Sequence, residues 1–216
     1  MDFSAARRHM VESQIRTSRV VDEAVIAAMA DVPRERFVPG RLQPVAYIDE
    51  DLKISDGRYL MEPAVLARLL QEANVEPSDV VLDIGSGSGY GAAILARLAG
   101  TVFALESDPL LSARASQLFT ELGLDNVVPV DGPLAEGCPK HAPYNVILIE
   151  GAVETIPDVV VDQLEDGGRL VAVVQERGVG RATVVRRVGD HLSRRVVFDA
   201  AIPVLPEFRT PAGFVF

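Results

Sequence analysis

The chain has 216 residues, of which 48% are hydrophobic and 24% charged, the balance of a globular protein with a sizeable core. Its formal net charge of −10 argues against a nucleic-acid partner, because phosphate binding needs a basic surface. A single cysteine excludes an internal disulfide. The chain shows no run long enough to span a membrane and no signal-peptide pattern, so we expect a cytoplasmic protein without a membrane partner.

The first part of the chain is predicted to be helical and then irregular. Residues 4–16 and 22–31 are expected to form helices, the second with Asp22 as its N-cap. Residues 32–62 are punctuated by proline, glycine and charge with little periodicity, and a stretch of this kind in a compact chain is usually functional or disordered. Pro63 then begins a helix, since proline is favoured in the first turn.

From residue 79 onward, short apolar runs alternate with helical segments. The apolar runs predict buried parallel strands at 79–84, 101–106, 127–130, 144–150 and 169–174. Helices are predicted after the glycine turn (85–100), from Asp108-Pro109 to Gly123, and at 157–164. This alternation predicts an α/β fold with a Rossmann-like, mostly parallel sheet and helices on both faces.

The last part of the chain predicts strands without helices. Residues 181–188 and 192–202 are expected to form a C-terminal β-hairpin added to the sheet. We therefore expect a single domain over 1–216, divided into N-terminal helices and a loop (1–62), an α/β core (63–175) and C-terminal strands (176–216).

The most informative motif is a glycine-rich turn between a predicted strand and helix, LDIGSGSGY at 82–90. Glycines there permit a tight turn and a close approach of ligand to backbone, and a helix start suits a carboxylate or a phosphate. A dinucleotide turn would read G-x-G-x-x-G, but residue 90 is tyrosine in the register that starts at Gly85. The G-x-G-x-x-A register that starts at Gly87 would lie too far into the helix.

Acidic residues at the ends of three predicted strands favour S-adenosylmethionine over a dinucleotide. Asp83 would repel a pyrophosphate but attract the ammonium group of the methyl donor. Glu106 can accept both ribose hydroxyls, which alone fits either ligand, and Asp131 can accept a hydrogen bond from the adenine amine. We therefore predict a donor site at Asp83, Gly85, Ser86, Gly87, Glu106, Ser107, Asp131 and Gly132. The three histidines are scattered, so we expect no metal site.

With these residues in view, the chain resembles the protein-L-isoaspartate O-methyltransferase family over nearly its whole length. The resemblance rests on five segments, at 10–39, 81–98, 131–132, 141–152 and 164–174. It implies transfer of a methyl group from S-adenosylmethionine to the free α-carboxylate of isoaspartyl residues in damaged proteins or peptides. Since a carboxylate is already ionised at neutral pH, no general base is required, and we name no catalytic residue.

The predicted acceptor loop departs from the family pattern G-x-x-T-I-S-x-P, whose Thr and Ser hydroxyls lie at the acceptor site. This chain carries Tyr59 and Met61 at those two positions. Methionine donates no hydrogen bond, and losing a donor to a charged group should cost roughly 1.5–3 kcal/mol. Glu62 would make the site more acidic. The substrate-binding residues implied by the resemblance are Arg58, Tyr59, Leu60 and Met61, of which the first two could supply a substitute donor.

The changed loop leaves two alternatives beside isoaspartyl methylation. One is a methyltransferase for a different, small-molecule acceptor. The other is a non-catalytic protein that binds S-adenosylmethionine. A dinucleotide oxidoreductase is a more distant possibility. The sequence gives neither the oligomeric state nor whether residues 40–62 close as a lid.

Overall fold

The computed structural model describes residues 2–210, and its centre is a seven-stranded sheet in the order β5-β4-β3-β6-β7-β8-β9. The strands from β5 to β7 are parallel, whereas β8 and β9 pair antiparallel. Their bounds are β3 (Val80–Ile84), β4 (Thr101–Glu106), β5 (Val127–Asp131), β6 (Tyr144–Val153), β7 (Leu164–Glu176), β8 (Val179–Val188) and β9 (His191–Asp199). This topology confirms the predicted Rossmann-like sheet with a C-terminal hairpin.

Both faces of the sheet are covered, because alternate residues of its strands enter two different apolar clusters. On β3, Val81 packs on the face covered by α1 to α5, whereas Leu82 and Ile84 pack on the face covered by α6 and the segment after β9. The helices are α1 (Phe3–Met10), α2 (Glu23–Asp31), α3 (Pro63–Ala73), α4 (Tyr90–Leu95), α5 (Pro109–Glu121) and α6 (Asp158–Val161). None of the helices within 2–210 is long and apolar enough to cross a membrane.

Local signals place several helix starts where the sequence predicts them. The Asp22 carboxylate accepts hydrogen bonds from the backbone N–H groups of Ala24 and Val25, at 2.9 and 3.3 Å. Asp108 caps α5 in the same way, accepting from the N–H of Leu110 at 2.9 Å. These bonds satisfy donors that a helix start otherwise leaves free.

Three segments differ from the predictions. Residues 32–62, expected to be irregular, contain 3-10 turns and a hairpin of β1 (Leu52–Ser55) and β2 (Arg58–Leu60), whose apolar alternation is only a few residues long. The helix predicted at 157–164 is a single turn, because β7 already begins at Leu164. The helix predicted within 85–100 is reduced to the six residues of α4.

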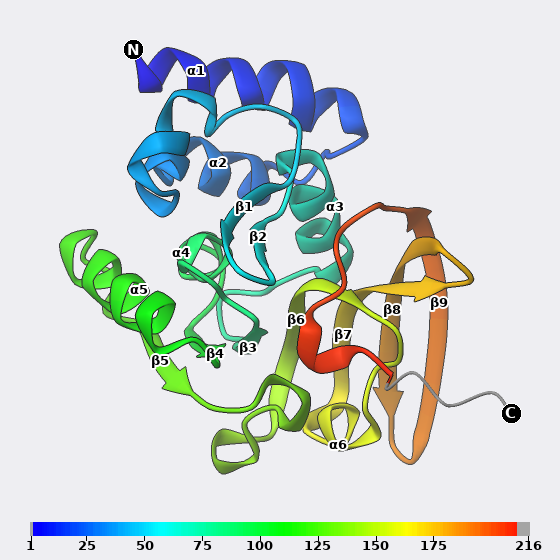
Figure 1. Ribbon diagram of the computed structural model, residues 1–216. Coiled ribbons are helices and arrows are strands. Elements are labelled where there is room, and N and C mark those ends of the chain that lie inside the picture. Colours follow the sequence, from blue (N-terminus) through cyan, green and yellow to red (C-terminus); the bar gives the residue numbers. More distant parts are fainter. Residues whose placement is uncertain (1, 211–216) are drawn as a thin grey trace, which may run out of the picture.

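The hairpin and the end of the chain approach the central strands from different sides. Figure 1 shows the cyan hairpin β1–β2 between the N-terminal helices and the central sheet, and the red segment after β9 running back beside β6. The N–H of Leu205 donates to the carbonyl of Ala152 at 2.9 Å, which attaches this last segment to β6. These two segments flank the glycine turn after β3.

Gly89 is the position of the turn that tolerates a side chain least. Its φ is +91°, and an added Cβ would lie 2.6 Å from the Phe119 ring and 3.1 Å from Ala115 Cβ. We expect Gly89→Ala to lower the free energy of unfolding by about 3 kcal/mol, because backbone strain adds to overpacking against α5. Gly123→Ala is the control, since its φ is also positive but nothing lies within 4 Å of an added Cβ. Equal losses for the two variants in denaturant unfolding would contradict the steric part of the argument.

Candidate active site

The glycine turn lies where the strand order of the sheet reverses. From β3 the chain builds the sheet outward through β4 and β5, and then returns to place β6 on the other side of β3. In open α/β sheets, ligands bind at such a switch point, outside the carboxyl ends of the strands. Gly85 and Gly87 have φ of +77° and +56°, so the turn uses backbone geometry that other residues adopt only with strain.

Three acidic side chains point to the same face of the sheet around this turn: Asp83, Glu106 and Glu150. Since side chains alternate along a strand, Asp83 shares the face of Val81 on β3, and Glu106 that of Ala104 on β4. Glu150 lies on β6, beyond Leu148, which pairs with Asp83. The three carboxyl groups therefore lie beside the glycine turn on the same face of the sheet.

Asp83 and Glu150 form a buried carboxyl pair. They are 0% and 5% exposed, and neither Asp83 oxygen nor Glu150 Oε1 has a hydrogen-bond partner among the described residues. Burial raises the pKa of Asp83 to about 7, although interaction with the Glu150 carboxyl opposes the shift. Burial, followed by the negative charge of Asp83, raises the pKa of Glu150 well above its ordinary value. The pair therefore keeps a proton at neutral pH.

Glu106, by contrast, has hydrogen-bond partners for both carboxylate oxygens. Its carboxylate accepts backbone hydrogen bonds from Gly87, Ser107 and Asp108 at 2.9, 2.7 and 2.9 Å. It also accepts from Arg58 Nε at 3.1 and 3.2 Å, in an ion pair whose two side chains are 5% and 1% exposed. These hydrogen bonds fix the position of the Glu106 side chain at the end of β4.

Arg58 joins three segments that are distant in sequence. Beyond Glu106, it donates to Ser107 Oγ at 2.8 Å and to Glu207 Oε1 at 2.5 Å. This links the β1–β2 hairpin, the end of β4 and the segment after β9. Partial burial acts to raise the pKa of Glu207, but hydrogen bonds from Arg58 and Ser107 outweigh it, so the pKa of this carboxyl is lowered.

Apolar side chains from the same two segments cover the glycine turn. A Cβ on Gly87 would lie 3.0 Å from Ile54 Cδ1, and one on Gly85 would lie 3.2 Å from Leu205 Cδ1. The turn is therefore closed over by the hairpin on one side and by the C-terminal segment on the other.

A buried arginine connects the N-terminal part of the chain to the site. Arg34 is 0% exposed and donates to the carbonyls of Ala46 and Met61 at 2.7 and 2.8 Å, while its Nη1 has no partner among the described residues. Its guanidinium lies 4.9 Å from the ring centre of Tyr90, the first residue of α4. Arg34 thus connects the loop after α2 and the segment between β2 and α3 to the helix that follows the glycine turn.

The predicted donor-site residues come together at one edge of the sheet. Glu106 and Asp131 are direct partners in the β4–β5 register, and the N–H of Gly132 donates to the carbonyl of Glu106 at 3.1 Å. Asp131 accepts a hydrogen bond from Ser112 Oγ at 2.5 Å and is otherwise exposed. Ser86 is buried in the turn.

The four predicted acceptor-loop residues have different surroundings. Leu60 and Met61 pack in the core, and Arg58 is buried against Glu106, so only Tyr59 of these four is half-exposed. Burial and the neighbouring charges of Asp51 and Asp49 raise the pKa of Glu62 to about 7. At neutral pH this group is therefore only partly negative.

Glu150, Arg34 and Glu207 are residues of this site that the sequence does not predict. A signal for Glu150 exists: it is a charged residue inside the apolar run YNVILIEGAV, and a charge within a buried strand marks a special site. Arg34 and Glu207 have no comparable signal, because their partners lie 12 or more residues away along the chain.

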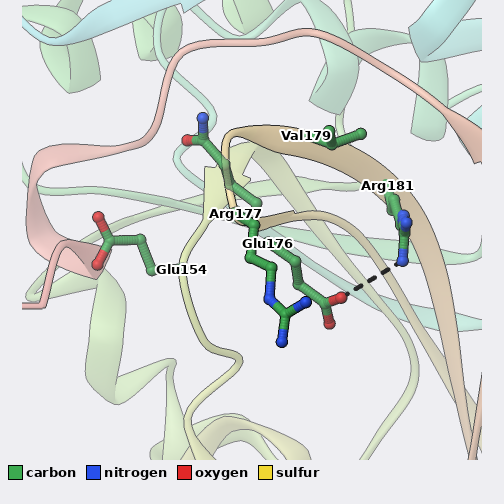
Figure 2. A pocket seen from close by; sticks show the side chains of 6 residues that line it. Glu154, Glu176, Arg177, Val179 and Arg181 are labelled. Carbon is green, nitrogen blue, oxygen red and sulfur yellow. Dashed lines mark hydrogen bonds and ion pairs between the residues drawn. The ribbon is translucent and has the colours of Figure 1, made fainter.

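A cavity of about 800 Å³ lies elsewhere, at the β7–β8 turn. Figure 2 shows Glu176 paired with Arg181 there, and Glu154 on the opposite side. Most of its lining residues are exposed, and we assign it no chemistry. Within residues 2–210, no group of three or more His, Cys, Asp or Glu side chains is placed to hold a metal ion.

The sheet order, the glycine turn at the switch point and the acids at the ends of β3 and β4 together define the class I methyltransferase fold. Residues 5–202 match the family model of protein-L-isoaspartate(D-aspartate) O-methyltransferase. The chain belongs to this family.

Individual relatives agree with this assignment. A protein-L-isoaspartate O-methyltransferase of Koribacter versatilis is 38% identical over 91% of this chain and 89% of its own length. One from Roseiflexus castenholzii is 38% identical over 92% and 91%. A crystal structure of a putative Plasmodium falciparum member in complex with S-adenosyl-L-homocysteine has a TM-score of 0.81 at 21% identity, covering 93% of this chain and 98% of that one.

Proposed function

We propose that the protein transfers the methyl group of S-adenosylmethionine to the free α-carboxylate of isoaspartyl residues in damaged proteins and peptides. The observation that carries the donor assignment is Asp83, whose two buried oxygens have no partner beside the glycine turn. Such a group suits a cationic ligand, because a buried acid without a partner is costly. Family membership supports the acceptor. The single cysteine, which is buried, fits a reducing cytoplasm, and we propose that location.

The donor site we propose follows the edge of the sheet. Asp83 faces the ammonium group, the backbone of Gly85, Ser86 and Gly87 allows close approach, and Glu106 with Ser107 accepts from the ribose. Asp131 and Gly132 lie where the adenine amine would be. When bound, the donor supplies a sulfonium methyl group that is already activated for displacement.

The chain's own residues contribute alignment and exclusion of water. Ile54 and Leu205 cover the glycine turn, which keeps solvent from the reacting atoms. An acceptor carboxylate needs no base, so a hydrogen-bond donor that positions it suffices. Tyr59 is the acceptor-loop side chain available for this role, and the raised pKa of Glu62 reduces its repulsion of an anionic acceptor.

Donor binding requires a rearrangement, because Arg58 occupies the carboxylate that would hold the ribose. Glu106 becomes available to the ribose only when Arg58 releases it, and Ile54, which covers Gly87, belongs to the same hairpin. The hairpin that carries Arg58 is therefore the part of the site that must move.

The direct test is methyl transfer to an isoaspartyl peptide, compared with the same peptide containing ordinary aspartate. We expect labelled methyl ester to form on the isoaspartyl peptide alone, because its free α-carboxylate is the acceptor. Binding of S-adenosylhomocysteine without methylation of either peptide would reject this acceptor and keep the donor site. Binding neither ligand would reject both.

A further inference from the structure

We infer that Glu150 is a second residue for the donor's ammonium group and that, with Asp83, it forms a carboxyl pair that releases a proton to solvent when the donor binds. This inference rests on the proposed donor site. The position of Glu150 on β6, across the switch point from Asp83 on β3, suggests this role.

The position of the Glu150 carboxyl is fixed by the helix that follows the glycine turn. It lies against Gly91, where an added Cβ would clash with Glu150 Oε1 and lie 2.8 Å from Oε2. Glycine at this position lets the carboxyl lie against the backbone of α4, beside Asp83. The two acids therefore lie side by side on the neighbouring strands β3 and β6.

The positive charge near the Asp83–Glu150 pair does not balance the acidic groups there. Asp83 and Glu106 are acidic neighbours that raise the pKa of Glu150, and Tyr90 from α4 is a neutral neighbour. Arg34 is the cation that faces it and lowers its pKa, but burial and Asp83 have the larger effect. A mobile ammonium group would supply the missing charge.

The proton count follows from this balance. Without ligand the pair keeps a proton at neutral pH, since burial disfavours two charges in contact. An ammonium group favours the ionised form, so binding expels the proton. The affinity for S-adenosylhomocysteine should therefore rise between pH 6 and pH 7.5. The rise is at most about tenfold per pH unit for each proton released.

The test compares two ligands that share the adenosine part. S-adenosylhomocysteine carries the ammonium group, whereas 5′-methylthioadenosine lacks it. We expect Glu150→Gln to weaken S-adenosylhomocysteine by about tenfold in calorimetry and to leave 5′-methylthioadenosine unchanged. Glu165→Gln, at an exposed position on β7, is the control and should alter neither.

Proton release gives a second measurement that needs no variant. Calorimetry of the wild-type protein in buffers with different ionisation enthalpies should show release on binding S-adenosylhomocysteine at pH 6.5, and less release for Glu150→Gln. Unchanged S-adenosylhomocysteine affinity in Glu150→Gln, or no proton release by the wild type, would overturn the inference. Failure of the wild type to bind either ligand would instead reject the proposed donor site.

Discussion

Replacing Asp83 with asparagine should weaken the binding of S-adenosylhomocysteine by about a hundredfold. The expected loss corresponds to about 3 kcal/mol, the upper range for a hydrogen bond to a charged group, because the proposed ammonium contact is buried. Asparagine keeps the volume of the side chain and removes its charge, so the loss reports charge and not packing. Isothermal titration calorimetry at pH 7.5 measures it.

The same substitution should make the ligand-free protein more stable at alkaline pH. The pKa of Asp83 is raised in the folded state from 3.8 to about 7, so the folded chain binds more protons than the unfolded chain between these values. Wild-type stability from this group is therefore fully present below about pH 4 and is lost as pH rises towards 7. We expect Asp83→Asn to gain on the order of 2 kcal/mol at pH 8, less than the full shift implies because a buried amide still needs a partner.

Asp79 provides a matched control near the opposite end of the same strand. It is 5% exposed but paired with Arg169 at 2.6 Å, away from the glycine turn. Asp79→Asn should lower stability and leave the affinity for S-adenosylhomocysteine unchanged, the reverse of the Asp83 result. Destabilisation by both variants, with no change in affinity for either, would make Asp83 a structural acid and contradict its assignment to the donor.

The parts of the fold that the sequence predicts are those with local causes. Asp22 and Asp108 cap helices through hydrogen bonds to residues two or three positions ahead. The glycine turn is predictable for the same reason, since positive φ at Gly85 and Gly87 is a property of the backbone itself.

The parts that escape prediction depend on distant partners. Arg58 is expected at an acceptor site from its place in the loop, yet its charge is taken up by Glu106 and Glu207, 48 and 149 residues away. The apolar alternation of β1 is too short to predict a strand. The contact between Ile54 and the glycine turn exists only in the folded chain. At 157–164 the helical pattern is overridden because Leu164 pairs with Tyr144 of β6 and starts a strand.

Arg58→Met should separate the two roles that the guanidinium has in this structure. Removing one partner of a buried ion pair leaves Glu106 without its counter-charge, so we expect the ligand-free protein to lose about 3 kcal/mol of unfolding free energy. The same change frees the carboxylate that we propose for the ribose. Affinity for S-adenosylhomocysteine should therefore rise by about tenfold, since the donor no longer has to displace Arg58.

Arg169→Met distinguishes this effect from general loosening of the fold. Arg169 is also largely buried and paired with an acid, Asp79, but it lies away from the glycine turn. Arg169→Met should lower the free energy of unfolding by a similar amount without raising the affinity for S-adenosylhomocysteine. A fall in donor affinity for Arg58→Met would mean that Arg58 forms part of the surface that holds the donor. A rise confined to Arg58→Met would instead establish the hairpin as a competitor for Glu106, because only that variant removes the side chain the donor must displace.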